Sequence, residues 1–403
     1  MALLNGSFLL QFFGFCVIVF WQFGDVMQFR ITKKSSKSRA RLGLLETAHG
    51  VVETPAIVGV ATLGAVKTLE SSQVMATGTQ MLIANTYHLH LRPGEKTVAK
   101  MGGLHEFMKW ERPMMTDSGG YQVFSLGYGR DYDVGKVLKE KRDAVKLVKA
   151  PKHLKITEDG VEFRSHIDGR KLFLGPRESV VVQEKIGADI IFAFDECTPP
   201  IADREYTIAA MERTHRWAKE CLRARKRKDQ AMYGIVQGGK YADLRKESAR
   251  IIGAMDFEGF GIGGEFGDNK VTMSKMIRGV VRELPDAKPR HLLGIGHPED
   301  VVRIIKEGVD TFDCTAMTHN ARHGSAFTSR GRIDVSKAQY VHDKKPLDPK
   351  CDCHVCKTYS RAYLCHLFRA KEFTGMQLLT FHNLYYMNTL VASVREKIRK
   401  GEI

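Results

Sequence analysis

Short apolar runs recur along the chain from residue 52 onward and alternate with amphipathic stretches. The runs are rich in Ile, Val, Leu, Phe and Ala, and polar residues do not alternate with apolar ones inside them. Runs of this kind are typical of strands that are covered on both faces, as in a parallel sheet. Eight of them are present, at 55–61, 81–85, 113–117, 189–195, 231–237, 257–264, 291–296 and 309–314.

The stretches between these runs have the pattern of amphipathic helices. In 297–308, acidic residues stand in the first turn and a glycine closes the end. Eight strand–helix units in roughly 300 residues predict an α/β fold of the TIM type, a (β/α)8 barrel. A doubly wound open sheet is the alternative. The apolar residues that we expect to share one face of the 297–308 helix are Val301, Val302, Ile304 and Ile305.

Two segments interrupt this rhythm between the third and fourth runs. Residues 128–157 are rich in lysine, and 154–176 alternates in polarity and carries two hairpin turn pairs, Asp159-Gly160 and Asp168-Gly169. We therefore expect a β insertion over the mouth of the barrel. The lysines between 136 and 155 fit a solvated helix face, and contact with RNA phosphates is the alternative. The basic run 223–228 is interpreted as a helix end, where cations suit the dipole.

The first 26 residues differ from the rest of the chain. Positions 8–23 are almost wholly apolar, and about 16 residues is the low end for a membrane span. The basic start and the cleavage site of a signal peptide are missing. If this segment were inserted, the basic residues after it would keep the body of the chain in the cytoplasm. We favour an upstream extension before a start at Met27, and do not expect membrane association.

Net charge and cysteine content indicate the kind of partner and the compartment that suit this chain. The chain has 62 Lys and Arg against 46 Asp and Glu, a net charge of +16, which is typical of proteins with a polyanionic partner such as nucleic acid. Eight cysteines in 403 residues are too few for a secreted disulfide scaffold, so we expect the reducing cytoplasm. No GxxxxGK[ST] loop occurs, so the sequence does not support ATP or GTP use. The glycines at 259–264 have the wrong spacing for a dinucleotide fingerprint.

Polar residues follow the apolar runs, where the carboxyl ends of barrel strands carry the chemistry. Asp117, Asp195 and Asp313 each stand at such an end, beside glycine pairs that expose backbone amides. A single carboxylate there could be a helix N-cap, but three are harder to explain in that way. Two carboxylates across a sugar suit displacement at an anomeric carbon, and Tyr121 offers a ring for stacking. The pattern indicates a nucleobase or glycoside substrate.

Three cysteines crowd into six residues and predict a metal site. Cys351, Cys353 and Cys356 place three thiolates in one tight loop, so a fourth ligand has to come from elsewhere. A closed Cys3His arrangement is typical of structural zinc. Spacing alone leaves the fourth ligand open among the candidate histidines, which are His354, His366 and His382.

At this point the motifs resemble a known family, tRNA-guanine transglycosylase. The resemblance runs from about residue 28 to 400, with the motifs in the same order. Members of that family are modified (β/α)8 barrels with a zinc-binding subdomain, and they exchange guanine at the anticodon wobble position for a 7-deazaguanine on the path to queuosine. The motifs that carry the likeness are NTYHL at 85–89, TDSGGYQ at 116–122, FRSHIDG at 163–169, FDEC at 194–197, IVQGG at 235–239, FDC at 312–314 and CxCxxC at 351–356.

The resemblance assigns roles to individual residues. It makes Asp313 the nucleophile on the ribose and Asp117 the general acid/base. Members of the family use a structural Zn2+, which here implies the ligands Cys351, Cys353, Cys356 and His382. The residues that would read and hold the base are Asp195, Gln237 and Gly264, with Ser118 helping and Tyr121 stacking on it.

The resemblance also implies partners. The FDEC form at 194–197 is similar to the bacterial branch, whose incoming base is 7-aminomethyl-7-deazaguanine. The implied partners are a tRNA whose anticodon begins with G and a second copy of the chain in a homodimer. The chain departs from the family at His319, where an arginine is usual, and at Leu293, where a methionine often packs on the base. These departures bear on anticodon and base recognition more than on the chemistry.

We therefore expect three parts. Residues 1–26 form the apolar extension, 27–345 the catalytic barrel with its Lys-rich insertion at 128–157, and 346–403 the zinc-binding subdomain and closing helix. The function expected is base exchange by an active enzyme, a pentosyltransferase. The alternative is a non-catalytic tRNA-binding subunit on the same scaffold, which is less favoured because both Asp117 and Asp313 are present.

Overall fold

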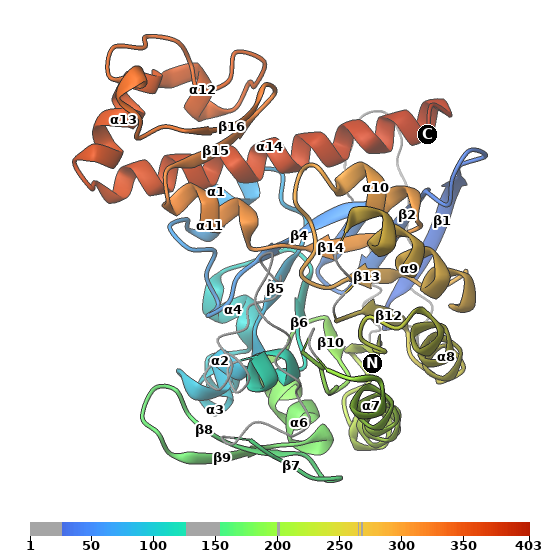
Figure 1. The fold of residues 1–403 in the computed structure, drawn as a ribbon. Helices are drawn as coiled ribbons and strands as arrows, with labels where there is room; N and C mark the ends of the chain where they lie inside the picture. The colour runs from blue at the N-terminus through green and yellow to red at the C-terminus, as the bar shows by residue number, and fades with distance from the viewer. Residues whose placement is uncertain (1–25, 126–153, 200–201, 265, 267–268) are drawn as a thin grey trace, which may run out of the picture.

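A closed barrel of parallel strands forms the body of the protein. The computed structural model describes residues 26–125, 154–199, 202–264, 266 and 269–403 (Figure 1). The strand order around the barrel is β10-β11-β12-β13-β14-β4-β5-β6, which confirms the predicted (β/α)8 barrel over the open sheet. Each strand overlaps one of the eight apolar runs: β4 (Ala56–Val60), β5 (Leu82–Ala84), β6 (Met114–Thr116), β10 (Ile190–Phe192), β11 (Ala231–Val236), β12 (Gly259–Ile262), β13 (Arg290–Leu292) and β14 (Thr311–Asp313).

The barrel strands are apolar on both faces because each face is buried against a different layer. On β10, Ile190 and Phe192 belong to one buried cluster, whereas Ile191 between them belongs to another. Neighbouring residues of a strand point to opposite faces, so the first cluster fills the barrel and the second lies under the helices. The inner cluster continues into Leu45 and Val52, which come from a separate sheet.

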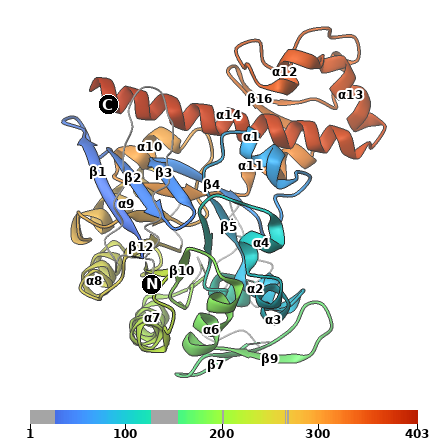
Figure 2. The same ribbon diagram turned by 180° about the vertical axis from the view of Figure 1, so that it is seen from behind.

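Helices surround the barrel. They follow the strands as the amphipathic stretches predict (Figures 1 and 2). The helices that accompany the barrel are α1 (Ser71–Ala76), α2 (Thr86–Leu91), α3 (Glu95–Lys100), α4 (Leu104–Met108), α6 (Pro176–Ile186), α7 (Arg204–Ala224), α8 (Ala242–Gly253), α9 (Lys270–Glu283), α10 (Val301–Lys306) and α11 (Ala316–Arg322).

The prediction for 297–308 needs a correction. Helix α10 is shorter than expected, and Val302 is 36% exposed while Val301, Ile304 and Ile305 are buried. At about 100° per residue, Ile304 and Ile305 lie on either side of Val301, whereas Val302 lies at the edge of the face that these three form. The basic run 223–228 does follow the last turn of α7 as predicted, and Arg225 there pairs with Glu258.

An antiparallel sheet precedes the barrel, and the sequence pattern did not predict it. Strands β1 (Gln28–Lys34), β2 (Arg41–Thr47) and β3 (Gly50–Thr54) form it in the order β1-β2-β3. Leu45 and Val52 of this sheet pack on the interior of the barrel. Because β3 leads directly into β4, the sheet lies near the amino ends of the barrel strands and helps to close that end (Figure 2).

The predicted β insertion between β6 and β10 is confirmed. Strands β7 (Lys155–Ile156), β8 (Val161–Arg164) and β9 (Lys171–Leu174) pair antiparallel, with turns at the two predicted Asp-Gly pairs. The predictions for the apolar segment 8–23 and for the lysines up to residue 153 lie outside the described residues.

The C-terminal part is a small subdomain followed by one long helix. It contains β15 (Ser325–Thr328), β16 (Gly331–Asp334), a 3-10 turn (Ala338–Tyr340), α12 (His354–Thr358), α13 (Arg361–Arg369) and α14 (Phe373–Lys400). Helix α14 begins against this subdomain and then runs back across the barrel, as Figure 1 shows. There Arg395 donates to the carbonyl of Pro55 at 2.9 Å, and Val394 and Ile398 join the buried layer outside the barrel.

Candidate active site and metal centre

Asp117 lies just beyond β6 and is held by several donors. Its Oδ1 accepts from the backbone amides of Thr86 at 2.8 Å and Gly119 at 3.2 Å. Its Oδ2 accepts from the side-chain amides of Gln122 at 2.7 Å and of Asn85. Burial raises the pKa of Asp117 above its ordinary value, while these hydrogen bonds act in the opposite direction. A carboxyl group with a raised pKa and a fixed orientation is suited to moving a proton.

Asp195 lies beyond the next strand of the barrel, β10, and is 4% exposed. Its Oδ1 accepts from the Ser118 hydroxyl at 2.9 Å, and its Oδ2 accepts from Gln237 Nε2 at 2.7 Å. Burial, with the nearby charge of Asp117 adding to it, raises the pKa of Asp195 from 3.8 to about 6. The structure therefore brings three of the predicted base-binding side chains into one hydrogen-bonded group.

Gln237 and Gly264 complete this group from β11 and β12. Gln237 follows β11, is buried, and has no hydrogen-bond partner for its Oε1 among the described residues. Gly264 follows β12 with φ +84°, and a Cβ built there would lie 2.7 Å from that same Oε1. A buried amide oxygen without a partner is uncommon and is available to a ligand. The glycine leaves the space in front of it open.

Asp313 stands at the end of β14, on another part of the same rim. Its Oδ1 accepts from the backbone amide of Gly294 at 2.8 Å and lies 3.3 Å from His291 Nε2. The other nitrogen of that imidazole, Nδ1, lies 3.0 Å from the Thr311 hydroxyl. The side chain of Asp313 is 13% exposed, so it can meet a substrate at the barrel mouth.

Tyr121, Leu293 and His319 lie outside the hydrogen-bonded group around Asp195. Tyr121 is half-buried in the helical turn after Asp117. Leu293 is partly buried and packs on the apolar interior of the barrel. His319 is exposed on α11, with its ring centroid 4.5 Å from that of His323, so it lies on the surface and not in the buried group.

The four predicted metal ligands come together in the C-terminal subdomain. His382 Nδ1 lies 3.9, 3.5 and 3.4 Å from the sulfurs of Cys351, Cys353 and Cys356. His382 Nε2 donates to the carbonyl of Phe327 at 2.8 Å, which leaves the Nδ1 lone pair facing the three sulfurs. Three thiolates and one neutral imidazole in a closed group fit a tetrahedral divalent metal such as zinc.

The structure also decides between the candidate histidines. His354 and His366 are exposed, and neither belongs to the cluster, whereas His382 is fully buried in it. Cys365 is buried too, but its sulfur contacts the carbonyl of Lys337 and not the cluster. The cysteine loop alone could not show this, because His382 reaches the site from α14.

Comparison with known proteins identifies the family of the chain. The family model described as queuine tRNA-ribosyltransferase matches residues 35–403. The chain belongs to this family. It is 46% identical over 379 residues to the queuine tRNA-ribosyltransferase of Caldanaerobacter subterraneus subsp. tengcongensis, a match that covers 94% of this chain and 95% of the relative. It is 44% identical over 378 residues to the protein of the same name from Desulforamulus reducens, covering 94% and 96%. The resemblance drawn from the motifs is thereby confirmed.

Some residues of the candidate site were not singled out from the sequence. His291 and Gly294, which hold Asp313, were seen only as part of an apolar run. Asn85, Thr86 and Gln122 stood in recognised motifs but received no role. For His291 and Gly294, the only indication in the sequence was a histidine within a buried strand.

Among the described helices, none is long and apolar enough to cross a membrane.

Proposed function

We propose that the protein exchanges guanine at the anticodon wobble position of a tRNA for 7-aminomethyl-7-deazaguanine. Asp313 attacks the anomeric carbon of the ribose as the bond to guanine breaks, which gives a covalent ester between enzyme and RNA. The incoming base then displaces Asp313. Each displacement inverts the anomeric carbon, so two in succession retain it.

The proton balance of the exchange falls to Asp117. Protonated Asp117 gives its proton to the departing guanine, and the resulting carboxylate then takes the proton from the incoming base as that base attacks. The raised pKa of Asp117 supports the protonated form that the first half needs. Asp313, in contrast, is held by the Gly294 amide, a donor suited to an ionised nucleophile.

The observation that carries the proposal is the joint placement of these groups. Two carboxylates stand on different strands of one barrel mouth, and a separate buried carboxyl–amide pair, Asp195 and Gln237, lies beside Asp117. Asp195 can accept from the N–H groups of a purine edge, and Gln237 Oε1 is free to accept a further hydrogen. This supports base reading by that pair, with Gly264 leaving room for the base.

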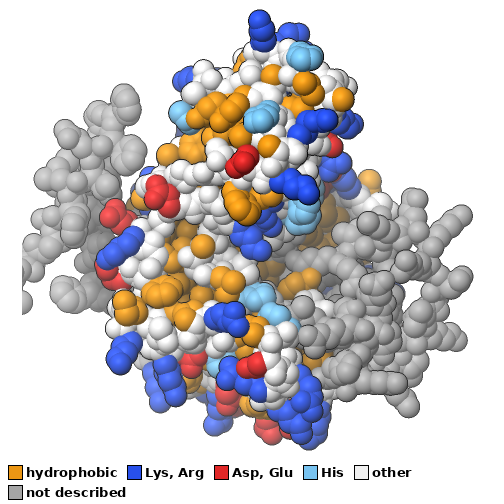
Figure 3. All heavy atoms as spheres, turned by 90° about the vertical axis from the view of Figure 1, so that its left-hand side faces the viewer, with side chains coloured by type: hydrophobic (Ala, Val, Ile, Leu, Met, Phe, Trp, Pro, Cys, Tyr) orange, Lys and Arg blue, Asp and Glu red, His pale blue; other side chains and the backbone are white. Residues whose placement is uncertain are grey.

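The partners follow from charge and chemistry. A net charge of +16 supports tRNA binding, and Lys and Arg side chains are spread over the face that carries the C-terminal subdomain and the β8–β9 hairpin (Figure 3). The cysteine cluster would hold a structural Zn2+ that keeps α14 attached to the subdomain. We expect a homodimer in the cytoplasm; no disulfide joins the described cysteines, which is compatible with a reducing compartment.

Guanine exchange tests this proposal directly. The full chain is incubated, without ATP, with labelled guanine and a tRNA whose anticodon begins with G. Label should enter that tRNA but not a control tRNA whose anticodon begins with another base. A chain that binds tRNA with salt-sensitive affinity and incorporates no label would be the non-catalytic subunit instead, and the proposed function would be wrong.

A further inference from the structure

A second group of metal-ligating side chains lies at the other end of the barrel. Within the described part of the chain, His49, His105 and Asp189 place one ligand atom each within 4.8 Å of the others. Asp189 immediately precedes β10, and Asp195 follows the same strand. Six residues of extended chain span about 20 Å, so this group is well separated from the base-binding residues.

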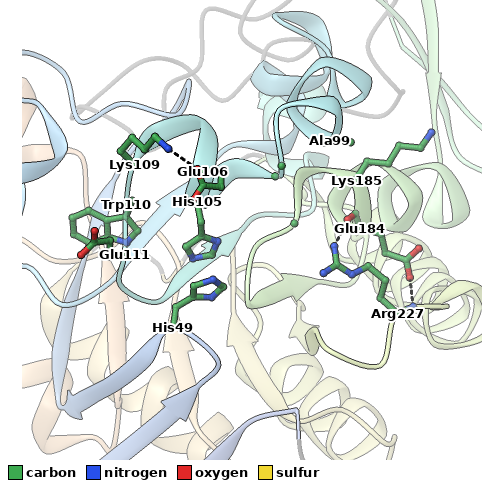
Figure 4. A pocket seen from close by; sticks show the side chains of 13 residues that line it. His49, Ala99, His105, Glu106, Lys109, Trp110, Glu111, Glu184, Lys185 and Arg227 are labelled. Carbon is green, nitrogen blue, oxygen red and sulfur yellow. Dashed lines mark hydrogen bonds and ion pairs between the residues drawn. The ribbon is translucent and has the colours of Figure 1, made fainter. Parts of the chain in front are cut away.

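The three side chains come from segments that are distant in the sequence. His49 stands in the turn between β2 and β3, His105 in α4, and Asp189 at the start of β10. Figure 4 shows the two imidazole rings one against the other, and both line a cavity of about 760 Å3. Their centroids are 3.6 Å apart and their planes differ by 10°. Three elements thus bring their ligands to one point.

The carboxylate is already oriented for coordination. Asp189 Oδ2 accepts from the Met114 backbone amide at 2.8 Å, and Oδ1 lies 2.6 Å from His49 Nδ1. A ligand that is fixed by a hydrogen bond from outside the site is a regular feature of metal centres. The side chain of Asp189 is 4% exposed, so its charge is buried beside the two imidazoles.

One nitrogen of the group is buried without a hydrogen bond. His105 Nε2 lies 3.2 Å from Asp189 Oδ2, but the two atoms are not aligned for a hydrogen bond. This leaves a buried imidazole nitrogen in ion-pair contact with a carboxylate but without a hydrogen bond, and a metal ion between the two atoms would satisfy both. Coordination would replace the hydrogen bond between His49 and Asp189, and it requires the His49 ring, which is 40% exposed, to turn so that its lone pair converges with that nitrogen.

From this arrangement we infer that His49, His105 and Asp189 form a second site for a divalent metal ion of the zinc type. Two imidazoles and one carboxylate are ligands that Zn2+ takes at about 2.0–2.2 Å. Three protein ligands leave a fourth tetrahedral position, and the exposed side of His49 opens it to water in the cavity. The ion would join the β2–β3 turn to α4 and to β10. This site is independent of the proposed base exchange.

Metal counting tests the site. The full chain is stripped with a chelator and dialysed against Zn2+, and bound zinc is measured by elemental analysis. The wild type should hold two zinc ions per chain, one at the cysteine cluster and one at the new site. His49→Gln and His105→Gln should each hold one. His90→Gln is the matched control, because His90 also pairs with a carboxylate, Glu95 Oε2 at 2.8 Å, but belongs to no group of three metal-ligating side chains among the described residues, so it should keep two.

Cobalt provides a readout that does not depend on stability. The equivalent of Co2+ bound at the cysteine cluster should give thiolate-to-metal charge-transfer absorption, and the second equivalent should bind without adding to it. His49→Gln, in which an exposed side chain is changed, should lose only the second equivalent. A wild type that binds one metal ion per chain, or a His49→Gln variant that still binds two, would overturn the inference and leave the group as an ion pair.

Discussion

Gln237 donates to the buried carboxyl group of Asp195, with 2.7 Å between Nε2 and Oδ2, and keeps its own Oε1 unpaired among the described residues. One amide therefore fixes the acceptor beside it and offers a second acceptor to a ligand. The two residues follow the adjacent strands β10 and β11, so the barrel itself sets their geometry.

The raised pKa of Asp195 predicts a pH-dependent stability. Between about pH 4 and pH 6 the unfolded chain has lost the Asp195 proton and the folded chain keeps it, so rising pH favours unfolding. A rise in pKa from 3.8 to about 6 corresponds to a loss of about 3 kcal/mol, complete above pH 6.

Asp195→Asn should remove that loss. Gln237 can turn its unpaired Oε1 toward the new amide, so the variant keeps a hydrogen bond there. Urea unfolding of both proteins from pH 4 to pH 8 measures the difference. The variant should gain stability relative to the wild type up to pH 6 and then run parallel to it. A difference that is constant with pH would contradict the assignment.

Gly264→Ala should weaken binding of the free base. The new Cβ would lie 2.7 Å from Gln237 Oε1 and displace the amide from its position beside Asp195. A residue other than glycine at φ +84° also costs roughly 1–3 kcal/mol. Gly331→Ala is the matched control, because it has φ +102° and nothing within 4 Å of its Cβ. Both variants should lose similar stability, but only Gly264→Ala should raise the KM for the base; equal KM values would argue against base contact at Gly264.

His291→Phe should lower kcat with little change in the KM for tRNA. Phenylalanine keeps the ring but removes the nitrogen that faces Asp313, so the proposed nucleophile loses its contact with His291. A poorly placed reacting group can cost roughly 100-fold. Thr311→Val, which removes the hydroxyl on the other side of the imidazole, should cost less. Steady-state kinetics decide: a large rise in KM with unchanged kcat would make His291 a binding residue instead.

Cys353→Ala should lose the metal of the C-terminal subdomain. Structural zinc contributes roughly 10–16 kcal/mol of apparent binding energy in small peptides, so its loss should loosen the subdomain and the start of α14. Cys365→Ala is the control, since it removes a buried thiol outside the cluster. Limited proteolysis and elemental analysis should show cleavage near residues 346–372 and loss of zinc in the first variant alone. Full zinc retention in Cys353→Ala would contradict the assignment.

The barrel was predictable because most residues of its strands are buried on both faces, so that each strand overlaps a short apolar run. The β1–β3 sheet was not. Its first strand, β1, is half-exposed and ends in two lysines, so it carries no such run. The contact between His291 and Asp313 was also out of reach, because it depends on the register of β13 against β14, in which His291 pairs with Thr311. The aspartates themselves could be found, since each ends a recognisable strand.

The proposed exchange depends on a covalent bond between Asp313 and the tRNA ribose. Wild-type protein mixed with a tRNA whose anticodon begins with G should give a protein–RNA adduct that survives denaturing electrophoresis. Asp313→Asn keeps the shape but lacks the negative charge, so it should bind tRNA through phosphate contacts and give no adduct. Asp117→Asn leaves the nucleophile intact and should slow exchange by roughly 100- to 10,000-fold. An adduct in Asp313→Asn, or near wild-type exchange by that variant, would contradict the double-displacement account.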